Sequence, residues 1–152
     1  VVRVDLAAVP VNLHLLAQSV AEVLAPQYEH ARIELEAVPE AMGDATLLRQ
    51  VLFNLMDNGL KYSRHQPTPE LKVGYSSAQR AYFVRDNGMG FDMAHADKLF
   101  GLFQRLHAGS DVPGPGVGLA IVARILERHG GRLWADSAPG QGTTFWFRLP
   151  HP

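Results

Sequence analysis

Residues 44–63 decide the fold more than any other stretch, and they read DATLLRQVLFNLMDNGLKYS. The apolar residues recur three and four positions apart, as on one face of an α-helix, and Asp44 can serve as the N-cap. At the border of that face, Asn54, Asn58 and Lys61 form one stripe. Asparagine is a mediocre helix former that needs hydrogen-bond partners once it is buried. We therefore predict a helix whose amide stripe faces the edge of a cavity.

The amide stripe supports two interpretations. The asparagines could cap neighbouring loops or bond to sheet ends, which is the usual role of a lone asparagine. Alternatively, amide oxygens suit Mg²⁺, which keeps several waters and shares its coordination shell with substrate phosphates. A lysine one turn along could then neutralise a phosphate. Two asparagines with a lysine on one stripe favour the second interpretation.

The rest of the chain mixes strand and helix patterns. Apolar alternation and β-type composition predict strands at 1–6, 31–38, 70–76, 81–86, 131–137 and 143–149. Helical spacing predicts helices between Pro10 and Pro26 and over 117–129, with a patchy helix over 93–106. Pro39 and Gly43 indicate a loop. This order predicts an α+β fold, a two-layer sandwich with helices on one face of a mixed, mostly antiparallel sheet.

Composition narrows the function. The 152 residues, 47% of them hydrophobic, fit one globular domain over 1–152, which could be excised from a longer protein. With 14 basic and 15 acidic side chains, nothing suggests capture of nucleic acid or an anionic membrane. No apolar stretch approaches the roughly 18 residues of a membrane span. The absence of cysteine excludes a disulfide framework and a thiolate nucleophile, and it fits a cytoplasmic location.

A second polar cluster, DNGMG, occupies residues 86–90 at the end of a predicted strand. Asn-Gly after a strand is also the strongest short hairpin signal, so the cluster proves nothing alone. A carboxylate at a sheet end, followed by glycines that allow close backbone approach, would nevertheless suit adenine. The exocyclic amino group of adenine donates a hydrogen bond where guanine presents an acceptor. Asp86 could therefore select adenine over guanine.

The third cluster, GPGVGL, occupies residues 114–119 and runs into the predicted helix over 117–129. Backbone N–H groups at a helix N-terminus can bind an anion. The cluster lacks the strand context of a dinucleotide fingerprint and the Gly-Lys-Ser/Thr of a Walker A loop. Four glycines and two prolines over residues 108–118 predict a mobile segment without regular structure in its middle.

Together with LFGLFQRLH at 99–107, these clusters resemble the catalytic, ATP-binding domain of bacterial sensor histidine kinases. That superfamily also contains DNA gyrase and the ninety-kilodalton heat-shock chaperones. Residues 44–63 are similar to its N box, 86–91 to its G1 box, 99–107 to its F box and 114–147 to its G2 box and closing strands. The kinases of the phytochrome-linked group look most similar. The resemblance covers almost the whole chain and implies a Bergerat-type fold.

The resemblance implies a role for each site residue. Asn58 would coordinate Mg²⁺ with support from Asn54, and Lys61 and Arg105 would contact phosphate. Tyr62 would line the nucleotide pocket, and Asp86 would accept from the adenine amino group. Gly88 and Gly90 would admit the base, and Thr143 would complete the adenine end through water. Phe100 and Phe103 would anchor a lid, although core packing is an alternative for both, and a solvated charge is one for Arg105. The lid would close over the triphosphate by means of Gly114, Gly116, Gly118 and the adjoining Leu119.

Two positions depart from the family pattern, because Gly59 replaces a common alanine and Pro115 a common threonine. Gly59 should weaken its helix by about 1 kcal/mol relative to alanine, and Pro115 should stiffen the lid. Hydrolytic relatives carry a glutamate general base where this chain has Asn54, and an amide cannot act as a base. The site is therefore expected to orient ATP for transfer and to avoid hydrolysis.

The phosphoacceptor histidine is expected on a separate dimerisation domain, absent from this chain, with a response regulator downstream. In the family an acidic residue typically follows it, and none of the seven histidines here is followed by one. His129 is placed at a helix end, where a cation is favourable. Two alternatives are a stand-alone serine kinase of the anti-sigma type, which the 99–107 segment argues against, and a non-catalytic nucleotide-binding module.

Overall fold

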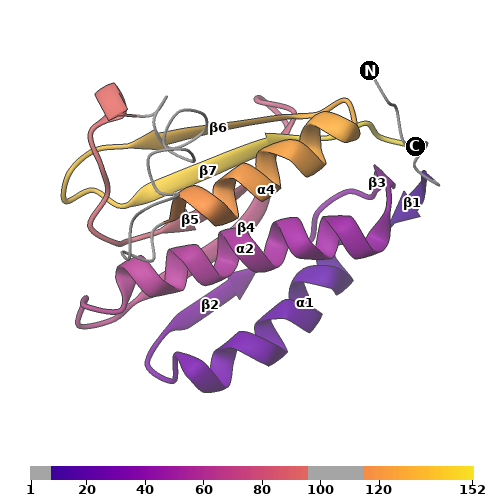
Figure 1. Ribbon diagram of the computed structural model, residues 1–152. Helices are drawn as coiled ribbons and strands as arrows, with labels where there is room; N and C mark the ends of the chain where they lie inside the picture. Colours follow the sequence, from indigo (N-terminus) through magenta and orange to yellow (C-terminus); the bar gives the residue numbers. More distant parts are fainter. Residues whose placement is uncertain (1–7, 96–114) are drawn as a thin grey trace.

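The computed structural model describes residues 8–95 and 115–152, and its centre is a five-stranded sheet (Figure 1). The strand order is β2-β4-β5-β7-β6. β2 (Arg32–Leu35) runs parallel to β4 (Glu70–Ser76), and the other neighbours are antiparallel. These are β5 (Ala81–Asp86), β7 (Thr143–Arg148) and β6 (Arg132–Ser137). The predicted mixed, mostly antiparallel sheet is confirmed.

Among the described residues, three helices form the second layer, and Figure 1 shows them together on one face of the sheet. They are α1 (Leu13–Leu24), α2 (Ala45–Ser63) and α4 (Pro115–Arg128), with short 3₁₀ turns at η1 (Ala25–Gln27) and η2 (Met93–His95). The predicted two-layer α+β sandwich is therefore confirmed. Among the described helices, none combines the length and the apolar character that crossing a membrane requires.

The central helix α2 begins where the sequence indicates. The Asp44 carboxylate accepts a hydrogen bond from the Leu47 N–H at 3.0 Å, which satisfies one of the free donors of the first turn. Further along, Leu55, Met56 and Leu60 are fully buried between the other helices and the sheet. α2 packs against the other two described helices and against the sheet. The polar side chains at its border are therefore held at a fixed place beside the sheet.

Several predicted boundaries differ from the structure. Residues 39–43 are not simply a loop, because β3 (Ala41–Gly43) pairs with β1 (Val9–Val11) in a small second sheet. The strand predicted over 31–38 is shorter in the structure, where β2 covers only Arg32–Leu35. The helix α4 begins at Pro115, inside the stretch that was expected to be irregular. Proline suits a first helical position, where its missing N–H has no helical partner. The predicted strand at 1–6 and residues 96–106 of the patchy helix lie outside the described residues.

His129 stands directly after α4, as expected, but its ring is buried and hydrogen bonds reach both of its nitrogens. Nδ1 lies 2.8 Å from the carbonyl of Ile125, and Nε2 accepts the backbone N–H of Asp44 at 3.1 Å. A Cβ on Gly43 would lie 2.6 Å from this ring. His129 thus fastens the end of α4 to the start of α2.

Candidate functional site

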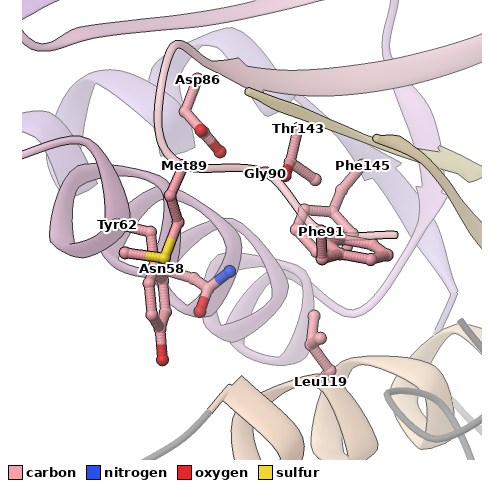
Figure 2. Close-up of a pocket in the computed structure, with 9 residues that line it drawn as sticks. All are labelled: Asn58, Tyr62, Asp86, Met89, Gly90, Phe91, Leu119, Thr143 and Phe145. Carbon is pink, nitrogen blue, oxygen red and sulfur yellow. The ribbon is translucent and has the colours of Figure 1, made fainter. Parts of the chain in front are cut away.

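A cavity of about 180 Å³ opens between α2, the end of β5 and the start of α4 (Figure 2). A cavity of roughly 150 Å³ accommodates a benzene molecule. This cavity can therefore enclose an aromatic ring system, whereas the rest of a larger ligand would remain outside it. Its walls combine apolar rings with a few polar groups, namely Asn58, Tyr62, Asp86, Met89, Gly90, Phe91, Leu119, Thr143 and Phe145.

Asp86 is the buried acid of this cavity, with 7% of its surface exposed. It is the last residue of β5 and pairs directly with Thr143, which is 8% exposed. Burial raises the pKa of the Asp86 carboxyl to about 6, although backbone hydrogen bonds from Gly88, at 2.7 Å, and from Thr143 oppose the shift. The chain therefore maintains a poorly solvated acceptor at the sheet end.

The loop that follows Asp86 is tied down on both sides by backbone hydrogen bonds. The N–H of Met89 donates to the Tyr62 carbonyl at 3.3 Å, and the Met89 carbonyl accepts from Gly140 at 2.7 Å. A Cβ on Gly88 would collide with the Tyr62 carbonyl, and one on Gly90, where φ is 67°, would collide with the carbonyl of Ala138. These glycines let the chain pack against its own backbone, and only Gly90 also lines the cavity.

Three lining residues were missed by the sequence reasoning, namely Met89, Phe91 and Phe145. Phe145 could have been found, because it lies two residues after Thr143 and therefore on the same face of β7. Met89 and Phe91 alternate with the glycines of the loop, and only the folded loop shows which way they point. Met89 is half exposed, at 53%. It thus borders the opening of the cavity.

The amide stripe of α2 is only partly brought to the cavity. Asn58 lines it and points its carboxamide into it (Figure 2). The side-chain nitrogen of Asn54 is buried with no hydrogen-bond partner among the described residues, and a Cβ on Gly118 would lie 4.0 Å from the Asn54 amide carbon. Asn54 therefore lies beside the first turns of α4. Lys61 is in the last turn of α2, half-buried and outside the cavity lining.

The remaining predicted residues divide into three groups. Tyr62 lines the cavity, and burial raises the pKa of its hydroxyl. Leu119 and Thr143 line it as well, whereas Gly118 is not among the described lining residues. Gly116 and Gly118 both belong to the start of α4. The others lie outside the described residues, and they are Phe100, Phe103, Arg105 and Gly114.

The sandwich and the ring-sized cavity with a buried carboxylate define the class of α+β nucleotide-binding domains. Residues 43–152 match the family described as histidine kinase-, DNA gyrase B-, and HSP90-like ATPase. The chain belongs to this family, and the resemblance found in the sequence is confirmed.

Two sequence relatives show the extent of the similarity. The methanogenesis regulatory histidine kinase FilI of Methanothrix harundinacea is 44% identical over 119 residues, which cover 77% of this chain and 13% of FilI. The phytochrome-like protein Cph1 of Synechocystis is 39% identical over 122 residues, which cover 79% of this chain and 16% of Cph1. The chain thus spans less than a fifth of either protein.

Solved structures agree on the fold. Full-length ShkA in complex with AMPPNP superposes with a TM-score of 0.79 at 28% identity, covering 98% of this chain and 32% of ShkA. The mycobacterial sensor histidine kinase MprB gives 0.78 at 24% identity, covering 96% of this chain and 99% of the MprB chain. At that lower identity the likeness to MprB concerns the fold alone.

Proposed function

We propose that this chain binds Mg·ATP and transfers the γ-phosphoryl group to a histidine on a separate dimerisation domain of a two-component sensor kinase. The observation that carries the proposal is the buried Asp86 carboxylate at the wall of a ring-sized cavity, in a member of the histidine kinase-like ATPase family. The relative FilI is a histidine kinase, which disfavours a serine kinase or a non-catalytic module.

Asp86 supports the adenine end of the proposal. A carboxylate accepts hydrogen bonds, so it pairs with the exocyclic amino group of adenine and opposes the carbonyl of guanine at that position. Because Asp86 is poorly solvated, an unpaired acceptor facing it costs more than it would in water. The apolar rings of Phe91 and Phe145 lie in the same wall and supply contact area for the base.

The residues near the opening fit a magnesium ion that is held mainly by phosphates. Among the described residues, no group of three or more His, Asp or Glu side chains could hold a metal ion. The Asn58 carboxamide points into the cavity, and the buried Asn54 amide has an unpartnered nitrogen, so both amides are available to a ligand. Asn58 would hold Mg²⁺ with support from Asn54, and the ion would balance phosphate charge.

The same residues support transfer rather than hydrolysis. Asp86, at the base end, is the only carboxylate in the described lining of the cavity. Asn54 stands beside α4 and cannot take a proton from water. We therefore propose that the chain orients ATP and that the nucleophile is supplied in trans. Lys61 and, outside the described residues, Arg105 would balance phosphate charge. We also propose a response-regulator partner, a cytoplasmic location and a single domain over residues 1–152.

Calorimetry with ATP, ADP and GTP tests the nucleotide assignment. We expect ATP and ADP to bind more tightly than GTP, and Asp86→Asn to lose that preference. Asp136→Asn is the matched control, because Asp136 is an exposed acid on the other face of the sheet. Equal affinities of the unaltered chain for ATP and GTP would contradict the adenine assignment.

A transfer assay tests the reaction. The chain is mixed with the histidine-bearing dimerisation domain and γ-labelled ATP, and label on the histidine is measured. Tight ATP binding without transfer would favour the non-catalytic module instead.

A further inference from the structure

Ser137, the last residue of β6, lies outside the cavity lining but touches three groups around it. Its hydroxyl accepts the backbone N–H of Phe91 at 2.8 Å. The same oxygen lies 2.9 Å from the carbonyl of Gly142 and 2.9 Å from the hydroxyl of Thr143. Ser137 thus connects the loop after β5 to the first residue of β7.

The chemistry of these three contacts fixes the direction of each hydrogen bond. A serine hydroxyl has one hydrogen and two lone pairs. The Gly142 carbonyl can only accept, so the hydrogen of Ser137 goes there. Phe91 takes one lone pair, and the other is left for Thr143, whose hydroxyl must then be the donor. In this arrangement every donor and acceptor of the network has a partner.

The direction of the last bond decides what Thr143 offers to a ligand. Because its hydrogen points to Ser137, its oxygen presents only lone pairs to the cavity that it lines. Thr143 pairs directly with Asp86 across β5 and β7, and the two contribute the buried polar groups of this wall. The wall therefore presents acceptors from two neighbouring residues.

We propose that Ser137 is a specificity-determining, positioning residue of the nucleotide site. By taking the hydrogen of Thr143, it makes this wall selective for a base that carries a donor at position 6, a 6-aminopurine, and against one that carries an acceptor at position 6, a 6-oxopurine. The inference rests on the proposed nucleotide binding. Ser137 does not line the cavity, and it acts on the nucleotide site through Thr143.

The test compares ATP with inosine triphosphate, which carries a 6-oxo group and no 2-amino group, so the two bases differ at the edge concerned. Affinities are measured by calorimetry for the unaltered chain, Ser137→Ala, Ser137→Cys and Ser137→Thr. In Ser137→Ala the Thr143 hydroxyl is free to turn and donate to the 6-oxo group. A hydrogen bond of about 1 kcal/mol corresponds to roughly a fivefold change, so we expect the ATP preference to fall about fivefold.

The other variants separate positioning from structure. Ser137→Thr keeps the hydroxyl and should keep the preference, whereas Ser137→Cys keeps the volume but bonds weakly and should lose part of it. The matched control is Ser19→Ala, because the Ser19 hydroxyl also donates to a carbonyl, at 2.8 Å from Leu16, but belongs to α1. Ser19→Ala should change thermal stability without changing the ratio of the two affinities.

Two outcomes have distinct meanings. If Ser137→Ala, or Ser137→Cys where the alanine variant does not fold, lowers the melting temperature and leaves the ratio unchanged, Ser137 is only structural and the inference is wrong. The proposed function would be untouched by that result. If the unaltered chain binds neither nucleotide, the proposed function fails and the inference falls with it. Thr143→Val gives an independent check, because it removes the acceptor and should lower the same ratio.

Discussion

The two faces of the five-stranded sheet treat polar groups in opposite ways. On the face that packs on the helices, Asp86 and Thr143 are almost fully buried among apolar side chains. On the outer face, Lys72 lies 3.5 Å from Glu34 and 3.3 Å from Glu36, all with solvent access. Removing the partner of a solvent-exposed charge costs little stability. The pKa of a buried ionisable group, in contrast, is shifted by burial and by the groups around it. The comparison indicates where polar residues carry function.

Aromatic side chains sharpen the contrast. On the outer face, Phe83, Trp146 and Trp134 pair directly across β5, β7 and β6, with ring centroids 5.4 and 6.2 Å apart. Arginines cover these rings, and Arg148 lies 5.0 Å from the Trp134 centroid. On the inner face, the rings of Phe91 and Phe145 line a cavity instead. The outer rings are covered by other side chains of the protein, whereas the inner rings border a cavity that has space for a ligand.

The largest effect on stability is expected at Gly142, which brings the turn between β6 and β7 against the inner end of β5. Its φ is 76°, and a Cβ there would collide with the Asp86 carbonyl. A left-handed conformation costs a non-glycine residue about 1–2 kcal/mol, and overpacking adds about 1–3 kcal/mol. We expect Gly142→Ala to lower the free energy of unfolding by about 2–5 kcal/mol in urea titrations.

Gly140 is the control for this prediction, since its φ is also 76° but no described heavy atom lies within 4 Å of the added Cβ. Gly140→Ala should show only the conformational cost of about 1–2 kcal/mol. Equal losses in the two variants would mean that the close approach to Asp86 contributes nothing.

The second effect is a pH dependence of stability that comes from Asp86. Its folded pKa of about 6 lies above the ordinary value of 3.8, so between these pH values the folded state binds more protons than the unfolded state. Stability should therefore fall as pH rises from about 4 to 6, by at most about 3 kcal/mol for two pKa units. Above pH 6 the ionised Asp86 exerts its full destabilising effect, and below about pH 4 it exerts none.

Asp86→Asn isolates this contribution, because the amide does not titrate. Urea unfolding at several pH values should show that the variant loses the decline between pH 4 and 6 and is more stable than the unaltered chain at neutral pH. An unchanged decline would assign the effect to another group. Together with the expected loss of adenine preference, this would show that the site retains a destabilising charge for binding.

Much of this contrast was predictable from local sequence. β4 and β5 occupy the residues predicted for them, because apolar alternation over 70–76 and 81–86 is bounded by turn residues. The start of α2 follows from Asp44, whose cap bond is a local interaction. Asp86 and Asn58 were also selected from local patterns, and both line the cavity.

The rest depends on contacts between distant residues. The three-residue strands β1 and β3 carry almost no alternation, and each exists because the other pairs with it. The helix-end position of His129 gives no sign that its ring accepts the Asp44 N–H, 85 positions away. The role of Ser137 likewise appears only when the loop after β5 and the start of β7 meet around its hydroxyl.

The third effect tests the outer face. Trp134 stacks on Trp146 and lies under Arg132 and Arg148, at 5.5 and 5.0 Å. An exposed cation–π contact contributes about 0.5–1 kcal/mol, so Trp134→Leu should lower stability by about 1–2 kcal/mol. Nucleotide affinity should not change, because none of these rings lines the cavity. Trp134→Phe keeps a ring and should lose less, and a large change in affinity would show that the two faces are coupled.

The smallest effect is expected at Lys72, on the same outer face. A hydrogen bond and the charge of Glu36, followed by the charge of Glu34, raise the pKa of Lys72. These partners are exposed, so water and salt screen the attraction, and most such surface pairs contribute little. Lys72→Met should leave the melting temperature indistinguishable from that of the unaltered chain at physiological salt. A clear loss that disappears at 1 M salt would show that the outer face, too, depends on charge.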